Sequence, residues 1–132
     1  MDSHLTATAQ QCLAASYAGT LDFPSIVRTL MEAGFEGYEV DFRRGRTTYF
    51  VPSGDAVELH LPAGGGVAAE FKPGVVEEAV REAQRKAPGY TYEGFCAKVK
   101  AAGCAGYMVS FSGRRVVYFG RTAETHVEHF PK

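Results

Sequence analysis

The sequence predicts an α+β domain of two tandem helix-helix-strand-strand-strand repeats, related by a pseudo-twofold, with an antiparallel sheet packed with helices. Three observations support this prediction: a long internal duplication, helix-type periodicity before one glycine of each copy, and strand-type periodicity after that glycine. A chain of 132 residues has the size of one ordinary domain, so we expect a single domain over residues 1–132.

The duplication is seen when residues 23–62 are compared without gaps with residues 92–131, a shift of 69 positions. Eleven positions are identical: Ala33 and Ala102, Gly34 and Gly103, Gly37 and Gly106, Tyr38 and Tyr107, Val40 and Val109, Phe42 and Phe111, Arg46 and Arg115, Tyr49 and Tyr118, Phe50 and Phe119, His60 and His129, and Pro62 and Pro131. A register shared over this length indicates two copies of one supersecondary unit. We place them at about 3–62 and 72–131, with a glycine-rich linker over 63–70.

Each copy begins with two predicted helices. The first helix has an apolar stripe at helical spacing, formed by Leu5, Ala9, Cys12, Leu13 and Tyr17 in one copy and by Val75, Val76, Ala79, Val80 and Ala83 in the other. The second helix has a similar stripe, formed by Phe23, Ile26, Val27, Leu30 and Met31 or by Tyr92, Phe95, Cys96, Val99 and Ala102. Asp22 and Thr91 stand at N-cap positions of the second helices. Gly34 and Gly103 are predicted to end these helices with a positive φ.

Three strands follow in each copy. Residues 38–42 and 107–111 alternate apolar and other side chains with a period of two, which is typical of a strand with one buried face. Tight turns at RRG and SGR lead into TTYFV and VVYFG, and third strands are expected around AVELHL and THVEHF. Strands joined by such short turns are antiparallel, so the helices either cover one sheet face or lie between two small sheets.

The last strand has two possible orientations. In the gapless register His126 and Glu128 match Val57 and Leu59, which would place a histidine and a carboxylate at core positions, bonded to each other or lining a cavity. A one-residue insertion in the preceding turn would instead turn Val127 toward the core and the polar side chains toward solvent. We favour the insertion, because exposing a polar pair costs less free energy than burying it.

Two segments of the chain resemble the YbcV-like family of small bacterial proteins. They are GTLDFPSIVRTLMEAGFEGYEVDFRRGRTTYFVPSG and VVEEAVREAQRKAPGYTYEGFCAKVKAAGCAGYMVSFSGRRVVYFGRTAETHVEHFP, and together they cover most of the sequence. The family carries a domain-of-unknown-function label and is sometimes called phage envelope protein. The resemblance implies one compact domain with no assigned activity and no established catalytic residues.

Composition and charge narrow the function classes. With 45 % hydrophobic residues, 22 % charged residues and a net charge of −1, the chain fits a globular protein and is not a globally basic nucleic-acid binder. No apolar run approaches the roughly 20 residues of a membrane helix, and the start of the chain has no signal-peptide pattern. Three cysteines in a domain of this size favour a reduced, cytoplasmic protein. No motif predicts a cofactor.

Two clusters are candidate sites. His126, Glu128 and His129 could form a ligand site, although the spacing is not that of a zinc protease and no third metal ligand is evident. Arg46 and Arg115 occupy equivalent turns, with Arg121 nearby, and the two turns could face one anion; we favour solvated hairpin tips. The cysteines align with apolar residues or lie on an apolar stripe, which indicates core packing.

These observations favour a non-enzymatic binding or interaction domain with no catalytic residues assigned. We expect a protein partner or self-association, no membrane and no nucleic acid. The alternative is a small enzyme or metal-dependent protein that uses His126, Glu128 and His129.

Overall fold

The structure, a computed structural model, describes residues 3–62 and 66–131. The first half contains α1 (Ser3–Ala18), α2 (Phe23–Ala33), β1 (Gly37–Asp41), β2 (Arg46–Phe50) and β3 (Ala56–His60). The second half contains α3 (Pro73–Gln84), α4 (Tyr92–Ala101), β4 (Cys104–Ser110), β5 (Arg115–Gly120) and β6 (Thr125–His129). This order confirms the predicted repeat. Of the predicted linker over 63–70, residues 63–65 lie outside the described residues and 66–70 contain no helix or strand.

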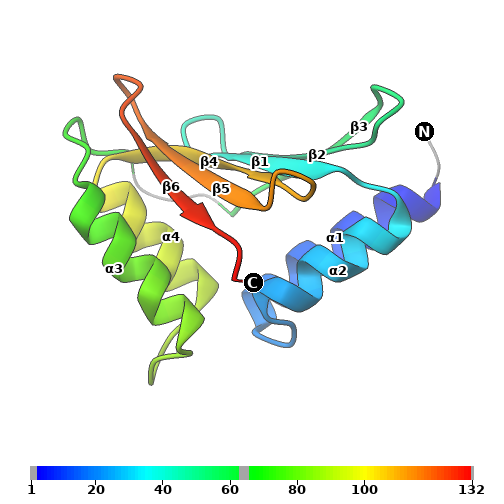
Figure 1. Cartoon of the computed structure of the whole chain (residues 1–132), viewed down its shortest axis with the longest axis horizontal. Coiled ribbons are helices and arrows are strands. Elements are labelled where there is room, and N and C mark those ends of the chain that lie inside the picture. The colour runs from blue at the N-terminus through cyan, green and yellow to red at the C-terminus, as the bar shows by residue number, and fades with distance from the viewer. Residues whose placement is uncertain (1–2, 63–65, 132) are drawn as a thin grey trace.

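All six strands form one antiparallel sheet in the order β3-β2-β1-β4-β5-β6. Both helical hairpins lie on the same face of this sheet, and β3 and β6 are its two edges (Figure 1). The prediction of a sheet packed with helices is therefore confirmed in its single-sheet form. The opposite face, which we call the open face, is not covered by any helix of the described chain (Figure 1).

The two halves join through β1 and β4. Glu39 lies directly opposite Met108 in this pairing, and these two residues are also equivalent in the sequence repeat. A local pseudo-twofold axis therefore passes between them. The ladder ends symmetrically, since Phe42 N–H donates to Ala105 O at 2.9 Å and its equivalent Phe111 N–H donates to Glu36 O at 3.1 Å.

The helix starts follow the predicted capping. Asp22 Oδ1 accepts the Ser25 N–H at 3.0 Å, and Thr91 Oγ1 accepts the Gly94 N–H at 2.9 Å. Both bonds satisfy a backbone donor that the first helical turn leaves free. The two caps confirm that the α2 and α4 starts are equivalent.

The turns repeat even where the residue type differs. Gly45 and its equivalent Arg114 have φ of 69° and 53°, and Gly54 and its equivalent Ala123 have φ of 100° and 72°. Left-handed backbone is disfavoured for residues with a Cβ, so the second half keeps these turns at some cost in conformational energy. The two turns therefore keep the same backbone geometry in the second half, although arginine and alanine replace the glycines there.

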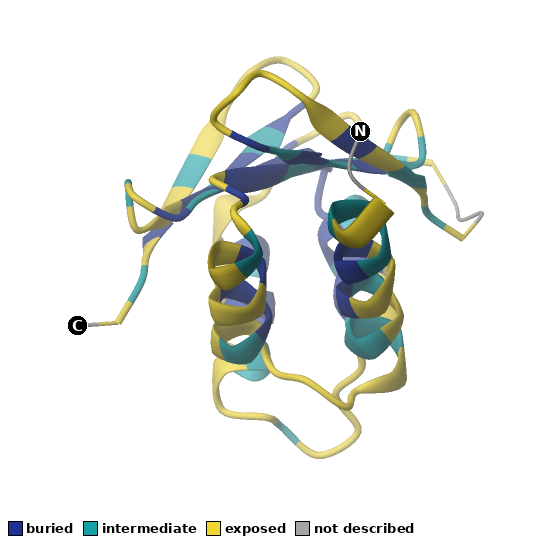
Figure 2. Cartoon of the chain, turned by 90° about the vertical axis from the view of Figure 1, so that its right-hand side faces the viewer, coloured by how far each residue is buried: buried dark blue, intermediate teal, exposed yellow. Residues whose placement is uncertain are grey.

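The core lies between the sheet and the helices, where buried positions gather on the facing sides of both layers (Figure 2). Tyr38, Val40, Tyr107 and Val109 are all buried, which confirms the predicted strand faces. The phenylalanines that end the two strand faces differ in burial: Phe111 is 4 % exposed, whereas its equivalent Phe42 is only half-buried.

The glycine corners have the predicted backbone, with φ of 109° at Gly34 and 86° at Gly103. Their surroundings differ. A Cβ at Gly34 would meet no neighbouring atom, whereas a Cβ at Gly103 would collide with the carbonyl oxygen of Glu70. The chain entering the second half crosses this corner, and Lys72 N–H donates to Ala102 O at 2.7 Å.

We predict that Gly103→Ala destabilises the protein more than Gly34→Ala. Each variant forces a Cβ into a left-handed backbone, which costs about 1–2 kcal/mol. Only Gly103→Ala also displaces the backbone of Glu70. Urea unfolding of both variants measures the difference, and equal midpoints would contradict the close packing at this corner.

We also predict that Phe111→Ala costs more stability than Phe42→Ala. Truncation of a buried phenylalanine costs about 3–5 kcal/mol, and Phe111 is the more buried of the equivalent pair. Chemical denaturation at one pH gives both values. A larger loss in Phe42→Ala would show that the exposure of these rings does not set their contribution.

Candidate functional site

The last strand lies in the gapless register, and the predicted one-residue insertion is wrong. β6 pairs with β5 so that His129 lies opposite Arg115, as His60 lies opposite Arg46 in the first half. Val127 is 40 % exposed on the open face, while Glu128 is 8 % exposed and faces the helices.

The burial of Glu128 is compensated by two bonds. Arg81 Nη1, from α3, donates to Glu128 Oε1 at 2.8 Å, and His126 Nε2 lies 2.5 Å from Glu128 Oε2. Each carboxylate oxygen therefore has its own partner, which removes the penalty of an unpaired buried carboxylate. The gapless register is tolerated because Arg81, 47 positions away in the chain, brings a cation to the buried carboxylate from another element.

The bonds within this cluster favour the ionised forms of Glu128 and Arg81. Burial by itself raises the pKa of Glu128, but the bonds from Arg81 and His126 outweigh burial and leave that pKa below its ordinary value. The bond to Glu128 likewise raises the pKa of Arg81. Arg81 also contacts Glu77, with Nη2 and Oε1 3.5 Å apart. The cluster is thus an Arg81–Glu128 ion pair, with Glu77 as a second partner of the arginine and His126 as a second partner of the carboxylate.

The first half has no such cluster. Val57 and Leu59 occupy the places of His126 and Glu128. Shortly after the first helix of each half comes a residue with positive φ, Gly19 or Lys86. Aligning these two residues places Ala14 of α1 at the position of Arg81. One edge of the domain is therefore held by charge and the other by apolar contacts.

His129 does not join the other two predicted ligand residues. It follows Glu128 by one position on the strand, so its side chain lies exposed on the open face. No group of three or more potential metal ligands comes together among residues 3–62 and 66–131. His126 and Glu128 thus form a pair rather than part of a three-ligand site.

The predicted arginine cluster is also dispersed. Arg46 pairs in register with Asp41 and Arg115 with Ser110, and the antiparallel β1–β4 pairing places these positions at opposite ends of the sheet. Arg46 forms an ion pair with Glu58, its Nη1 lying 2.5 Å from Oε1.

The other two arginines bond to the backbone. Arg115 Nε donates to Gly113 O at 3.1 Å, and Arg121 Nη1 donates to Val67 O at 3.3 Å. The two hairpin turns therefore do not converge on one anion.

The three thiols are buried and belong to the core. Burial raises the pKa of Cys12, and it raises the pKa of Cys96 and of Cys104 to about 11. Thiols with raised pKa values are poor nucleophiles at neutral pH. This placement confirms the prediction that the cysteines are core residues.

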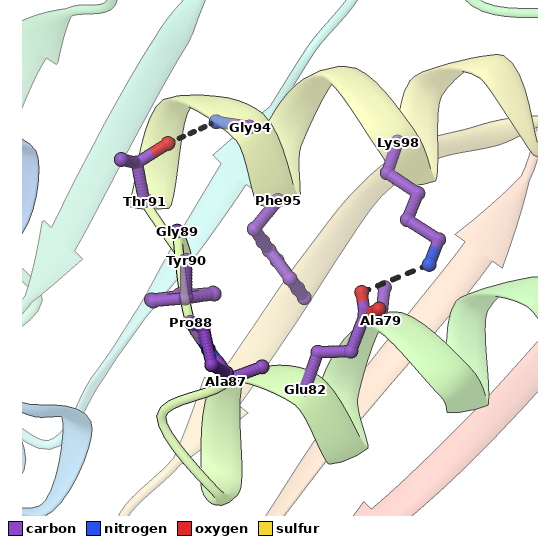
Figure 3. Close-up of a pocket in the computed structure, with 10 residues that line it drawn as sticks. All are labelled: Ala79, Glu82, Ala87, Pro88, Gly89, Tyr90, Thr91, Gly94, Phe95 and Lys98. Atoms are coloured by element: carbon purple, nitrogen blue, oxygen red, sulfur yellow. Dashed lines mark hydrogen bonds and ion pairs between the residues drawn. The ribbon is translucent and has the colours of Figure 1, made fainter.

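A pocket of about 210 Å³ lies between α3 and α4 (Figure 3). Three of its polar side chains are already bonded, since Lys98 Nζ lies 2.8 Å from Glu82 Oε1 at one end and Thr91 caps α4 at the other (Figure 3). Phe95 separates the two ends. Neither His126 nor Glu128 lines this pocket.

The open face differs sharply between the halves. At outward positions of β4–β6, Met108 is 46 % exposed and Val127 is 40 % exposed, and half-buried Val117 and Phe119 lie beside them. The equivalent outward residues of β1–β3 are Glu39, Glu58, Thr48 and Phe50. We call Met108, Val117, Phe119 and Val127 the open-face patch.

The predicted sites included neither this patch nor Arg81. The outward alternation of Met108 with Val109 was visible in sequence, but which face lay uncovered was not. Nothing in the sequence near Arg81 indicated a partner on β6.

No family model matches the chain, and no curated protein matches its sequence. The resemblance to the YbcV-like family therefore stays a prediction. Within the described ranges, no helix combines the length and apolar character needed to cross a membrane.

We predict that Glu128→Gln lowers stability at pH 7 by about 2 kcal/mol, the typical contribution of a hydrogen bond to a charged group. Because the pKa of Glu128 is lowered by folding, its stabilising effect is present above the pKa of an unfolded glutamate, about 4.3. It is lost as pH falls through the folded value. The difference between the variant and the natural protein should therefore shrink in acid, as measured by denaturation from pH 7 to pH 3.

Two matched variants control this prediction. Glu77→Gln removes the exposed partner of the same arginine and should cost less than about 0.5 kcal/mol. The double variant His126→Val with Glu128→Leu installs the residues of the first half and should fold with near-natural stability. A pH-independent loss in Glu128→Gln would contradict an ionic role.

Proposed function

We propose that this protein is a non-enzymatic interaction domain that binds another protein through the open-face patch. The observation that carries the proposal is the apolar character of Met108, Val117, Phe119 and Val127 on a sheet face without a covering layer. An antiparallel sheet with one face in water normally alternates apolar inward with polar outward residues. Contiguous exposed apolar side chains are typical of interaction surfaces.

The first half supplies an internal comparison. The same fold positions hold Glu39, Thr48 and Glu58 there, so the fold does not require apolar side chains at these places. Folding stability therefore does not explain Met108 and Val127. Binding to an apolar surface does, because it removes these side chains from water.

The charges around the patch indicate the chemistry of the partner. The outward positions of β4–β6 carry Arg115 and His129 at one end, and no carboxylate is among the described residues at those positions. An apolar protein surface bordered by acidic side chains complements this arrangement. The first half has the equivalent Arg46 and His60, but Arg46 is paired with Glu58, and Glu39 adds a further carboxylate that would repel such a border. The second half therefore fits the contact better.

The surroundings of the carboxylate of Glu128 and of the three thiols support a non-catalytic role. Glu128 bonds Arg81 and His126, and the three thiols are buried. Catalytic groups need access to a substrate and a pKa near the working pH. The internal bonds of the cluster suit a structural contact between α3 and β6.

The experiment uses photocrosslinking in cells. A photoreactive amino acid replaces Met108 in one variant and Glu39, its equivalent on the same sheet face, in the control. We expect one protein to cross-link through position 108 and not through position 39, and mass spectrometry identifies it.

The identified protein is then purified and its affinity measured by titration calorimetry. Met108→Glu and Val127→Glu should each weaken binding at least about tenfold, because each places a charge in an apolar contact. Val127→Glu should fold normally, since Glu58 occupies the equivalent place. Met108→Glu is combined with Glu39→Gln, because Glu39 lies directly opposite position 108 in the β1–β4 ladder and two carboxylates there would destabilise the fold. Equal affinity of these variants, or no position-specific cross-link, would overturn the proposal.

One observation favours a second candidate, a small enzyme. The 2.5 Å contact between His126 and Glu128 orients the imidazole as a carboxylate orients a general base. Thermal-shift screening with divalent metals and metabolites tests it. A stabilisation that is lost in His126→Ala but kept in His129→Ala would support this candidate, and a response shared by both variants would reject it.

A further inference from the structure

The outer edge of β3 has no neighbouring strand among residues 3–62 and 66–131. Val51 N–H donates to Asp55 O at 3.0 Å, and Leu61 N–H donates to Gly45 O at 2.8 Å. These bonds show that the odd-numbered residues of this segment direct their backbone groups toward β2. In an antiparallel ladder the alternate residues point the other way. Glu58 and His60 therefore direct their N–H and C=O groups outward from the sheet edge.

The side chains beneath this edge are apolar and only partly covered. Leu59 and Leu61, with Leu13 and Tyr17 of α1, line an open hollow of about 580 Å³. Proteins usually protect such an edge with charges or a covering segment. The equivalent helix-facing places beside β6 hold the Arg81, Glu128 and His126 cluster instead.

We propose that β3 is a dimerisation edge, at which β3 of a second copy of this chain pairs antiparallel with Leu59 opposite the partner's Leu59. This contact does not involve the open-face patch, because the patch lies on β4–β6, in the other half of the sheet from β3. The two sheets would continue into each other across the contact, with both open faces remaining accessible.

The hydrogen-bonding positions restrict the register. Only registers in which Glu58 and His60 face other outward-bonding residues are compatible with the ladder. Three such registers centre the twofold on Glu58, on Leu59 or on His60. The first places Glu58 against its own copy, and the third pairs Glu58 with Pro62, which has no N–H donor.

The register centred on Leu59 is complementary at each pair. Glu58 lies opposite the partner's His60 on the open face, and this pair occurs twice. On the helix-facing side, Leu59 meets its own copy and Val57 meets the partner's Leu61. A carboxylate opposite an imidazole N–H donor can form a hydrogen bond, and apolar residues directly across a strand pair are stabilising. The strand is thus self-complementary, which is what a twofold contact requires.

The other edge of the sheet does not have this property. The equivalent register at β6 would centre the twofold on Glu128 and place that carboxylate against its own copy. Like charges directly opposite each other are destabilising. In this register self-pairing is therefore favoured at β3 and not at β6, and a twofold β3–β3 contact closes as a dimer.

Sedimentation velocity over a concentration series tests the oligomeric state of the full chain. We expect a concentration-dependent species with twice the mass of one chain. His60→Glu places two like-charged pairs in the contact and should raise the dissociation constant at least about tenfold. The charge exchange Glu58→His with His60→Glu should restore dimerisation. His129→Glu, at the equivalent place on β6, should leave it unchanged.

A cross-link tests the register. Leu59→Cys should form a disulfide between two copies under mild oxidation, because directly opposed residues bring their Cβ atoms within reach. Tyr17→Cys, at the wall of the same hollow, should not. Circular dichroism checks that each variant folds. A monomer at all concentrations up to about 100 µM overturns the proposal. So does a dimer that is insensitive to His60→Glu and does not cross-link through position 59.

Discussion

The pairing of β1 with β4 is the contact on which the rest of the structure depends. It joins two repeats, each with only three strands, into one sheet with a shared core. Gly37 and Gly106 make the close approach possible, because a Cβ at either would collide with a carbonyl oxygen of the other half, that of Val109 or Val40. The two glycines are equivalent in the repeat, so each half supplies one position without a Cβ where the two strands approach closely.

The shared backbone lets the side chains of the two halves be compared position by position. Turns, caps and strand registers agree, yet the helix-facing side of the third strand is apolar in one half and ionic in the other. The ionic version costs desolvation and recovers it through Arg81, so its net contribution to stability is small. Its larger consequence is positional, since it ties edge strand β6 to α3.

The two edges and the two halves of the open face are consequently different surfaces on one symmetrical scaffold. Charge protects the β6 edge, while the β3 edge keeps leucines beside an open hollow. On the open face, Glu39 and Glu58 of the first half stand at the places that Met108 and Val127 occupy in the second half. A pseudo-symmetric fold with asymmetric surfaces can hold two different contacts without competition between them.

The sequence by itself determined the repeat, the element order, both N-caps, the glycine corners and the buried strand faces. Each of these depends on residues close together in the chain, such as Asp22 and Ser25, or on a periodicity within one element. Local propensity and alternation are sufficient for such features.

Only the tertiary structure decided the orientation of β6, the separation of Arg46 from Arg115 and the identity of the uncovered face. Each depends on contacts between distant segments. The burial of Glu128 is tolerable only because Arg81 reaches it from another element, and the distance between the two hairpin turns follows from the antiparallel pairing across the pseudo-twofold. Sequence patterns within one strand carry no information about a partner that folding brings from elsewhere in the chain.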